Sequence, residues 1–108
     1  ALLEYVVADP ESLCFVITRT DFRMHRLGSA RKIREMAATF MKAVAAGDDE
    51  PSGSVLHDAI IRPLGLKSTQ TRLVVVPDGP LYPIPFDALV RQGRRLNDDI
   101  EVSSAPSG

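Results

Sequence analysis

The sequence is poor in the residues that carry most enzyme and metal chemistry. Among its 108 residues there is one cysteine, there are two histidines, and there is no tryptophan. A single cysteine, Cys14, excludes an internal disulfide bond and a cysteine-rich zinc site. Nothing calls for an oxidising compartment, so the expected location is cytoplasmic.

An excess of charge and long apolar runs are missing as well. Thirteen Lys and Arg stand against fourteen Asp and Glu, a net charge of −1, so we expect no nucleic acid and no membrane among the partners. No apolar run approaches the roughly 18 residues of a membrane span. The hydrophobic and charged fractions, 44% and 25%, are those of a globular domain with one modest core. The chain opens with neither an initiator Met nor a signal peptide, which suggests a piece of a longer protein.

The first quarter of the chain has the pattern of an antiparallel β-meander. Three apolar, β-branched runs cover residues 2–8, 13–18 and 22–27, and short turn-prone links join them. In the third run Phe22 and Met24 alternate with Arg23 and His25. This alternation predicts a strand near the edge of a sheet, with Arg23 and His25 on its wet face.

The period then changes to that of helices. A stripe at helical spacing predicts a helix over residues 30–46, with Ser29 as N-cap and Gly47 just after its end. Residues 48–53 have the composition of a solvated acidic linker. A second helix is predicted over residues 55–62, which Pro63 ends or kinks. The stripe of the first helix consists of Ile33, Met36, Ala37, Phe40, Met41 and Val44.

The remaining elements predict an α/β fold. Residues 73–76 are apolar at four consecutive positions, which is typical of a central strand buried on both faces in a parallel sheet. Residues 77–80, Pro-Asp-Gly-Pro, form a predicted turn, because Gly79 tolerates a positive φ and the prolines lack donors. A short helix over residues 86–90 and a last strand over residues 100–104 follow.

The candidate catalytic residues each have a plainer interpretation. Cys14 lies inside a strand-like apolar run, which favours a core residue over a nucleophile. His25 is interpreted as a surface histidine. His57 has no His or Cys four residues away, as a helical metal site would require. We therefore assign no catalytic, cofactor-binding or metal-binding residue, and no cofactor.

Two further features have both a functional and a structural interpretation. The turn at residues 77–80 follows a buried strand, where α/β folds place phosphate loops, but its prolines remove the donors that such a loop needs. Residues 19–34 contain six basic residues and a single acidic one, Asp21. They are either a docking patch for an acidic partner or a solvated face, and we favour the solvated face. The six are Arg19, Arg23, Arg26, Arg31, Lys32 and Arg34.

Taken in order, these signals resemble the beginning of a CHAT domain, the caspase-like module found behind tetratricopeptide repeats. The most specific part is residues 72–89, RLVVVPDGPLYPIPFDAL, with its buried strand, Pro-Asp-Gly turn and Pro-Phe-x-Ala-Leu. Residues 56–64 are similar to the preceding helix, which ends in Pro-Leu, and residues 102–107 to the following strand and Ala-Pro-Ser turn. The opening hairpin, residues 2–5 and 13–19, is also similar to that of the family.

The resemblance implies a caspase-like α/β sandwich and, in active members, a cysteine endopeptidase. In the family that it resembles, the catalytic histidine and then the cysteine lie on later strand ends, and no position here matches either motif. Residues 1–108 would be the N-terminal part of one such domain, inactive alone, with the rest of the domain and tetratricopeptide repeats as partners in the parent protein. Open sheet edges could also support self-association. The alternative is a non-catalytic scaffold or protein-interaction module, a pseudoenzyme; a small ligand-binding α/β domain is a third hypothesis.

Overall fold

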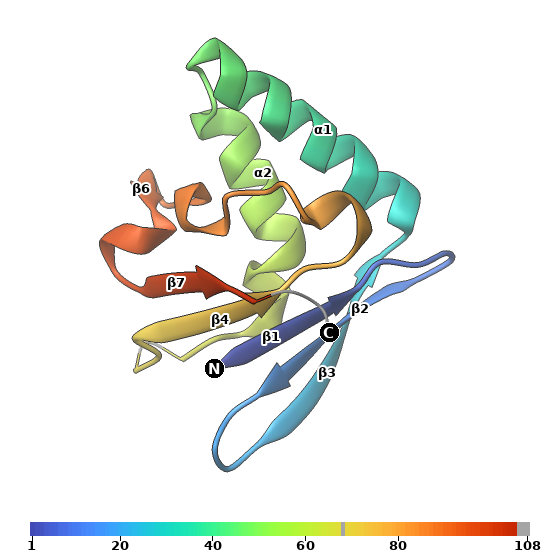
Figure 1. The fold of residues 1–108 in the computed structure, drawn as a ribbon, viewed down its shortest axis with the longest axis vertical. Coiled ribbons are helices and arrows are strands. Elements are labelled where there is room, and N and C mark those ends of the chain that lie inside the picture. The colour runs from blue at the N-terminus through green and yellow to red at the C-terminus, as the bar shows by residue number, and fades with distance from the viewer. Residues whose placement is uncertain (68, 106–108) are drawn as a thin grey trace.

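The computed structural model describes residues 1–67 and 69–105, and shows a mixed five-stranded sheet with helices packed on one side (Figure 1). The strand order is β3-β2-β1-β4-β7. This arrangement confirms the predicted α/β class. The strands are β1 (Leu2–Val6), β2 (Ser12–Ile17), β3 (Phe22–Gly28), β4 (Arg72–Val76) and β7 (Glu101–Ser104).

The predicted meander and the central position of β4 are both confirmed. β1 pairs with β2, and β2 with β3, in antiparallel register, whereas β4 pairs in parallel with β1 on one side and β7 on the other. After β3 the chain passes through two helices, which lie over one face of the sheet (Figure 1). This crossover lets β4 run parallel to β1 on the side opposite β2. The parallel set of the sheet is therefore β1-β4-β7.

Helix α1 (Ala30–Ala46) has the boundaries that its sequence predicts. The Ser29 hydroxyl accepts a hydrogen bond from the Lys32 amide, and Gly47 ends the helix with φ +76°. An L side chain rarely adopts this φ, so glycine suits the position. Ile33 and Phe40, from the predicted stripe, are fully buried. No helix within the described residues is long and apolar enough to cross a membrane.

Helix α2 (Glu50–Ile60) begins earlier than predicted, and the interpretation of residues 48–53 as a linker is wrong from Glu50 onward. Pro51 fits the first turn, where its missing N–H costs no hydrogen bond. Gly53 is buried where α2 meets α1. A β-carbon there would lie 3.0 Å from Cε1 of Phe40. Gly53, which makes the helix harder to predict from the sequence, therefore allows α1 and α2 to pack closely.

Short elements connect the main ones. The 3₁₀ turns η1 (Arg62–Leu64), η2 (Gly79–Leu81), η3 (Phe86–Ala88) and η4 (Leu96–Asp98) contribute buried Leu and Phe side chains. The predicted short helix over residues 86–90 is reduced to η3, because Val90 already belongs to β5 (Val90–Arg91). β5 pairs with β6 (Arg94–Arg95) in a small hairpin that the sequence did not predict.

The sheet has a covered inner face and an open outer face. On β4, Leu73 and Val75 are buried under the helices, whereas Val74 and Val76 on the outer face are only half-buried. The prediction that both faces of this strand are buried is therefore wrong within the described residues. The core lies entirely between the inner face and the helices, together with the 3₁₀ turns.

The predicted wet face of β3 is also wrong. Phe22 and Met24 are the exposed residues, at 63% and 49%, and His25 is half-buried on the inner face. The register explains the inversion, because His25 pairs with the buried Cys14. Across the outer face, the rings of Phe15 and Phe22 lie 5.8 Å apart.

Candidate functional site

Cys14 is part of the core, as its sequence context predicts. It is fully buried on the inner face of β2, and its thiol lies 3.8 Å from the carbonyl oxygen of Phe15. Burial raises the pKa of Cys14 from 9.0 to about 12, although a hydrogen bond with Tyr5 partly offsets that rise. The thiolate needed for nucleophilic attack is therefore disfavoured at neutral pH.

His57 lies on α2 and is also buried, with 3% exposure. Its Nδ1 is 3.3 Å from Oδ1 of Asp58, and its Nε2 is enclosed without a hydrogen-bond partner among the described residues. Burial lowers the pKa of His57, and the charges of Arg91 and Arg62 act in the same direction against Asp58. The net effect of these surroundings favours the neutral imidazole.

The structure does not gather these groups into a metal centre. Within residues 1–67 and 69–105, no group of three or more His, Cys, Asp and Glu side chains could hold a metal ion. His25 pairs with Cys14 across strands, and its Nε2 has no hydrogen-bond partner in the described part of the chain. His57 lies on a different element, α2.

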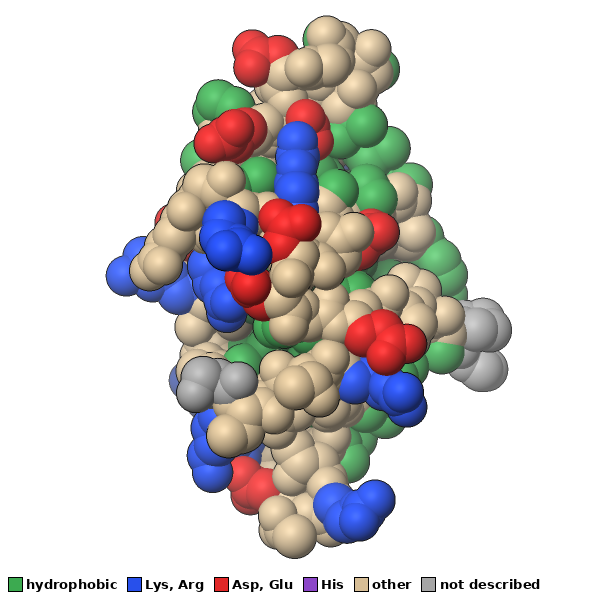
Figure 2. All heavy atoms as spheres, turned by 90° about the vertical axis from the view of Figure 1, so that its left-hand side faces the viewer, with side chains coloured by type: hydrophobic (Ala, Val, Ile, Leu, Met, Phe, Trp, Pro, Cys, Tyr) green, Lys and Arg blue, Asp and Glu red, His purple; other side chains and the backbone are tan. Residues whose placement is uncertain are grey.

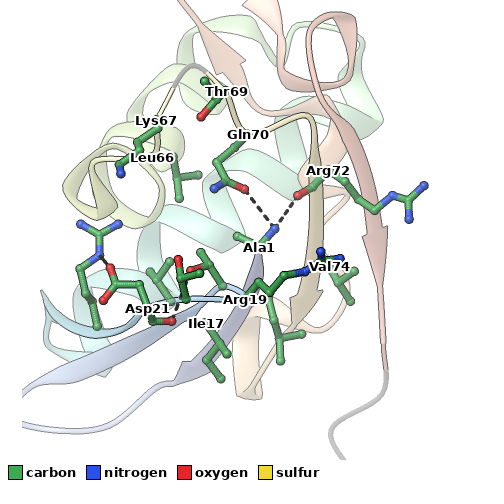
Figure 3. A pocket seen from close by; sticks show the side chains of 15 residues that line it. Ala1, Ile17, Arg19, Asp21, Leu66, Lys67, Thr69, Gln70, Arg72 and Val74 are labelled. Atoms are coloured by element: carbon green, nitrogen blue, oxygen red, sulfur yellow. Dashed lines mark hydrogen bonds and ion pairs between the residues drawn. The ribbon is translucent and has the colours of Figure 1, made fainter.

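A pocket of about 630 Å³ lies at the amino ends of β1 and β4 (Figure 3). The N–H groups of Ala1 donate to Gln70 Oε1 at 3.2 Å and to the Arg72 carbonyl oxygen at 2.8 Å, which ties the two strands together. Asp21 forms an ion pair with Arg23 at 3.2 Å. The carboxylate of Asp21 in the pocket lining is therefore already paired with Arg23. Lys67 and Arg19 add two further positive charges to the lining.

A second pocket, of about 470 Å³, lies between α2 and the β5–β6 hairpin. His57, Asp58 and Arg62 line one side, and Arg91 lines the other. Arg91 forms an ion pair with Asp99 at 3.5 Å. Both pockets are lined in part by Leu66, in the segment that leads into β4. Ligand sites of open α/β sheets usually lie at the opposite end, where the parallel strands have their carboxyl ends.

At the carboxyl ends, the turn after β4 has a structural role, as predicted. The Asp78 carboxylate accepts a hydrogen bond from the Val7 amide at 2.8 Å, which joins the ends of β1 and β4. Gly79 has φ +53°, and the Ala105 amide donates to the Val75 carbonyl oxygen at 2.8 Å. This edge of the sheet is fixed by backbone and carboxylate hydrogen bonds.

One ion pair holds the small hairpin against the helices. Arg95 donates from Nη1 and Nη2 to the two carboxylate oxygens of Asp49, at 2.6 and 3.1 Å, and also donates to the Ala88 carbonyl oxygen. The Arg95 guanidinium lowers the pKa of Asp49. Figure 2 shows this side of the molecule, where Lys and Arg lie interspersed with Asp and Glu.

Sequence reasoning missed Asp78 and Asp49 as structural carboxylates. Asp78 was part of the predicted turn, but its partner Val7 lies 71 residues away. Asp49 stood in the supposed linker, and its partner Arg95 stood in a segment with no predicted structure. Pro51 directly after three acidic residues was the available signal for a helix that starts at Glu50.

Comparison with known proteins identifies the family of the second half of the chain. The family model described as CHAT domain matches residues 50–108, which is more than half of the chain and extends from α2 through β7. The opening hairpin, which also resembles the family, lies outside the matched range. No curated protein and no solved structure matches the chain. By this match, the chain belongs to the CHAT domain family.

Proposed function

We propose that this chain is the N-terminal structural part of a caspase-like cysteine endopeptidase and that it positions a His/Cys dyad carried by later strands. In this proposal residues 1–108 are one incomplete domain, and no catalytic, cofactor-binding or metal-binding residue lies among them. The observation that supports it most is the parallel set β1-β4-β7, in which Asp78 joins the carboxyl ends of β1 and β4, and the Ala105 amide joins the end of β7 to β4. A rigid edge of this kind is suited to holding catalytic groups on adjacent strands.

The surfaces that the rest of the domain would cover are the β7 edge and the outer face. β7 pairs with β4 alone among the described residues, so a further parallel strand could add beside it. The outer face carries half-buried Phe15, Val74 and Val76. Covering each such side chain stabilises the fold by about 1 kcal/mol or more, which would favour association with helices of the missing part.

The experiment compares this chain with its parent protein on an unstructured protein substrate. We expect thiol-dependent cleavage by the parent and none by residues 1–108 alone. The parent should keep its activity when Cys14→Ala is introduced, because that thiol is buried. Thiol-dependent turnover by the chain alone would overturn the proposal, as would loss of activity in a parent that carries Cys14→Ala and remains folded.

A non-catalytic scaffold is the second candidate. Exposed Phe22 and Met24 on the edge strand favour it, because such side chains mark interaction surfaces. Reading about 150 further residues of the parent, roughly the size of one domain, separates the two candidates. A His motif and then a Cys motif at strand ends select the peptidase, and their absence selects the scaffold.

The setting is part of the same proposal. We place the protein in the cytoplasm, with tetratricopeptide repeats in the same parent chain. The single buried cysteine requires no oxidising compartment. Fractionation of cells that express the tagged parent would test the location, and recovery in a membrane or secreted fraction would contradict it.

A further inference from the structure

The hydrogen bonds of the β2–β3 hairpin determine which way the backbone of β3 points. The Thr18 amide donates to the Asp21 carbonyl oxygen at 2.9 Å, so these residues form a bonded pair at the end of the hairpin. Bonded and non-bonded pairs alternate along an antiparallel ladder. The register then makes Arg23 and His25 the next bonded residues of β3, with their backbone groups directed toward β2.

The alternate residues, Phe22, Met24 and Arg26, therefore direct their backbone groups away from the sheet. β3 is the last strand on this side within the described residues. The Phe22 amide is already bonded to Oδ1 of Asp21 at 3.0 Å, whereas the amides of Met24 and Arg26 have no such partner within residues 1–67 and 69–105. These unpaired groups form a template for one more strand.

The side chains along this edge are of two kinds. On the outer face, Phe22 and Met24 are 63% and 49% exposed, so a neighbouring strand could bury apolar residues against them. On the inner face, Arg23 and His25 are half-buried. Among the described residues, the one ion pair of this group is that between Arg23 and Asp21.

Positive charge continues from β3 into the first turns of α1. The helix follows β3 directly, and its first turn contains no acidic residue although the helix dipole favours one there. Arg31 is paired with Glu35 at 3.3 Å. Lys32 and Arg34 are exposed and form no ion pair in the described part of the chain. The chain as a whole has a net charge of −1, so this basic surface is a local feature.

We propose that the β3 edge binds an extended acidic segment of another protein, which adds to the sheet as a sixth strand antiparallel to β3. Backbone hydrogen bonds to Met24 and Arg26 would hold the segment, and its alternate apolar residues would cover Phe22 and Met24. Its carboxylates would face Arg23 and His25, and further acids could reach the first turn of α1. The preference for an acidic segment comes from charge complementarity.

A second copy of the chain fits this edge less well. Pairing two β3 strands would bring Arg23 and Arg26 of both copies close together, and like charges opposed across strands are destabilising. Charged residues on an edge strand are a common protection against such self-pairing. Self-association is therefore an outcome that the test must be able to detect.

The test uses the full chain and a fluorescent peptide of alternating valine and glutamate, with binding measured by anisotropy. Two methylated peptides separate strand addition from simple charge attraction. Methyl groups on the valine nitrogens remove the N–H groups that would face β3, and methyl groups on the glutamate nitrogens remove those that would face solvent. We expect the first to weaken binding at least roughly tenfold and the second to leave it within about twofold.

Three variants of the chain complete the design. Met24→Pro removes an outward N–H, a change that an edge strand tolerates, and Arg23→Glu reverses the charge that the peptide carboxylates would face. Each should weaken binding at least roughly tenfold. Lys42→Glu makes the same charge change on an exposed part of α1 away from the edge, and should have less than about a twofold effect. Thermal unfolding followed by circular dichroism verifies that each variant folds.

Several results would overturn the proposal. One is the absence of saturable binding by the wild-type chain. Another is equal affinity of the two methylated peptides, and a third is equal weakening by Arg23→Glu and Lys42→Glu. If sedimentation shows a wild-type dimer that Met24→Pro converts to monomer, the edge binds a second copy of the chain and the acidic segment is not its partner.

Discussion

At the scale of single residues, burial decides what Cys14 can do. Its side chain has no exposed surface, and burial raises its pKa to about 12. We expect a thiol reagent such as dithiobis-nitrobenzoate to modify Cys14 only after the chain is unfolded in urea. Absorbance of the released thiolate, with and without urea, measures the reaction. Rapid modification of the folded chain would contradict the burial of this thiol.

The same pKa shift predicts a loss of stability in alkali. Because the folded chain holds the proton of Cys14 more tightly than the unfolded chain does, this contribution is complete below pH 9.0 and is lost as the pH rises toward 12. The limiting slope for one proton is about 1.4 kcal/mol per pH unit. Urea unfolding between pH 8 and pH 10, compared with Cys14→Ala as control, should show a smaller decrease in the variant.

His57 predicts the opposite dependence in mild acid. Burial lowers its pKa in the folded chain, with Arg91 and Arg62 acting against Asp58, so the unfolded chain binds protons more readily below the ordinary value of 6.5. This contribution to stability is present above that pH and is lost as the pH falls. The free energy of unfolding should decrease less in His57→Gln than in wild type between pH 7 and pH 5. Identical pH dependence would contradict the assignment.

At the scale of elements, the contact between α1 and α2 depends on Gly53. A side chain there meets Cε1 of Phe40 at 3.0 Å and Cγ2 of Val90 at 3.2 Å, and Phe40 is fully buried and cannot yield easily. We expect Gly53→Leu to destabilise the fold by about 1–3 kcal/mol. Val55→Ala, on the exposed side of α2, should change stability by less than about 0.5 kcal/mol. Urea unfolding measures both, and equal effects would contradict the close helix contact.

The elements predicted best are those with several agreeing local signals. α1 has a cap at Ser29, a stripe at helical spacing and Gly47 at its end, so its boundaries could be derived from the sequence. The start of α2 could not, because Asp-Asp-Glu-Pro has a linker's composition and Gly53 weakens the helix pattern. The value of that glycine lies in packing against Phe40, which no local pattern contains.

The faces of β3 and the candidate sites show the same limit. Alternation in β3 indicated two faces, but the register with β2 determined which one is buried, and that register depends on the hairpin turn. By contrast, the burial of Cys14 could be predicted from the apolar residues on either side of it in the sequence. The link between Asp78 and Val7 joins residues 71 positions apart, so only the assembled sheet reveals it.

At the scale of the whole molecule, helices and 3₁₀ turns cover one face of the sheet and leave the other open within the described residues. The open face presents Phe22 and Met24, with half-buried Phe15 between β1 and β3. If later helices of the domain cover this face in the parent protein, it should be accessible to an apolar probe in residues 1–108 and inaccessible in the parent.

We therefore expect anilinonaphthalene sulfonate to fluoresce strongly with the isolated chain and weakly with the folded parent. Replacing Phe22 and Met24 together by Ser should lower the fluorescence of the isolated chain, because both side chains lie on the open face. Val55→Ser is the matched control, since Val55 is exposed at 55% on α2 and lies away from the sheet. Equal fluorescence of chain and parent would mean that later segments do not cover the outer face, and a loss with Val55→Ser as large as with the double variant would place the dye on the helices.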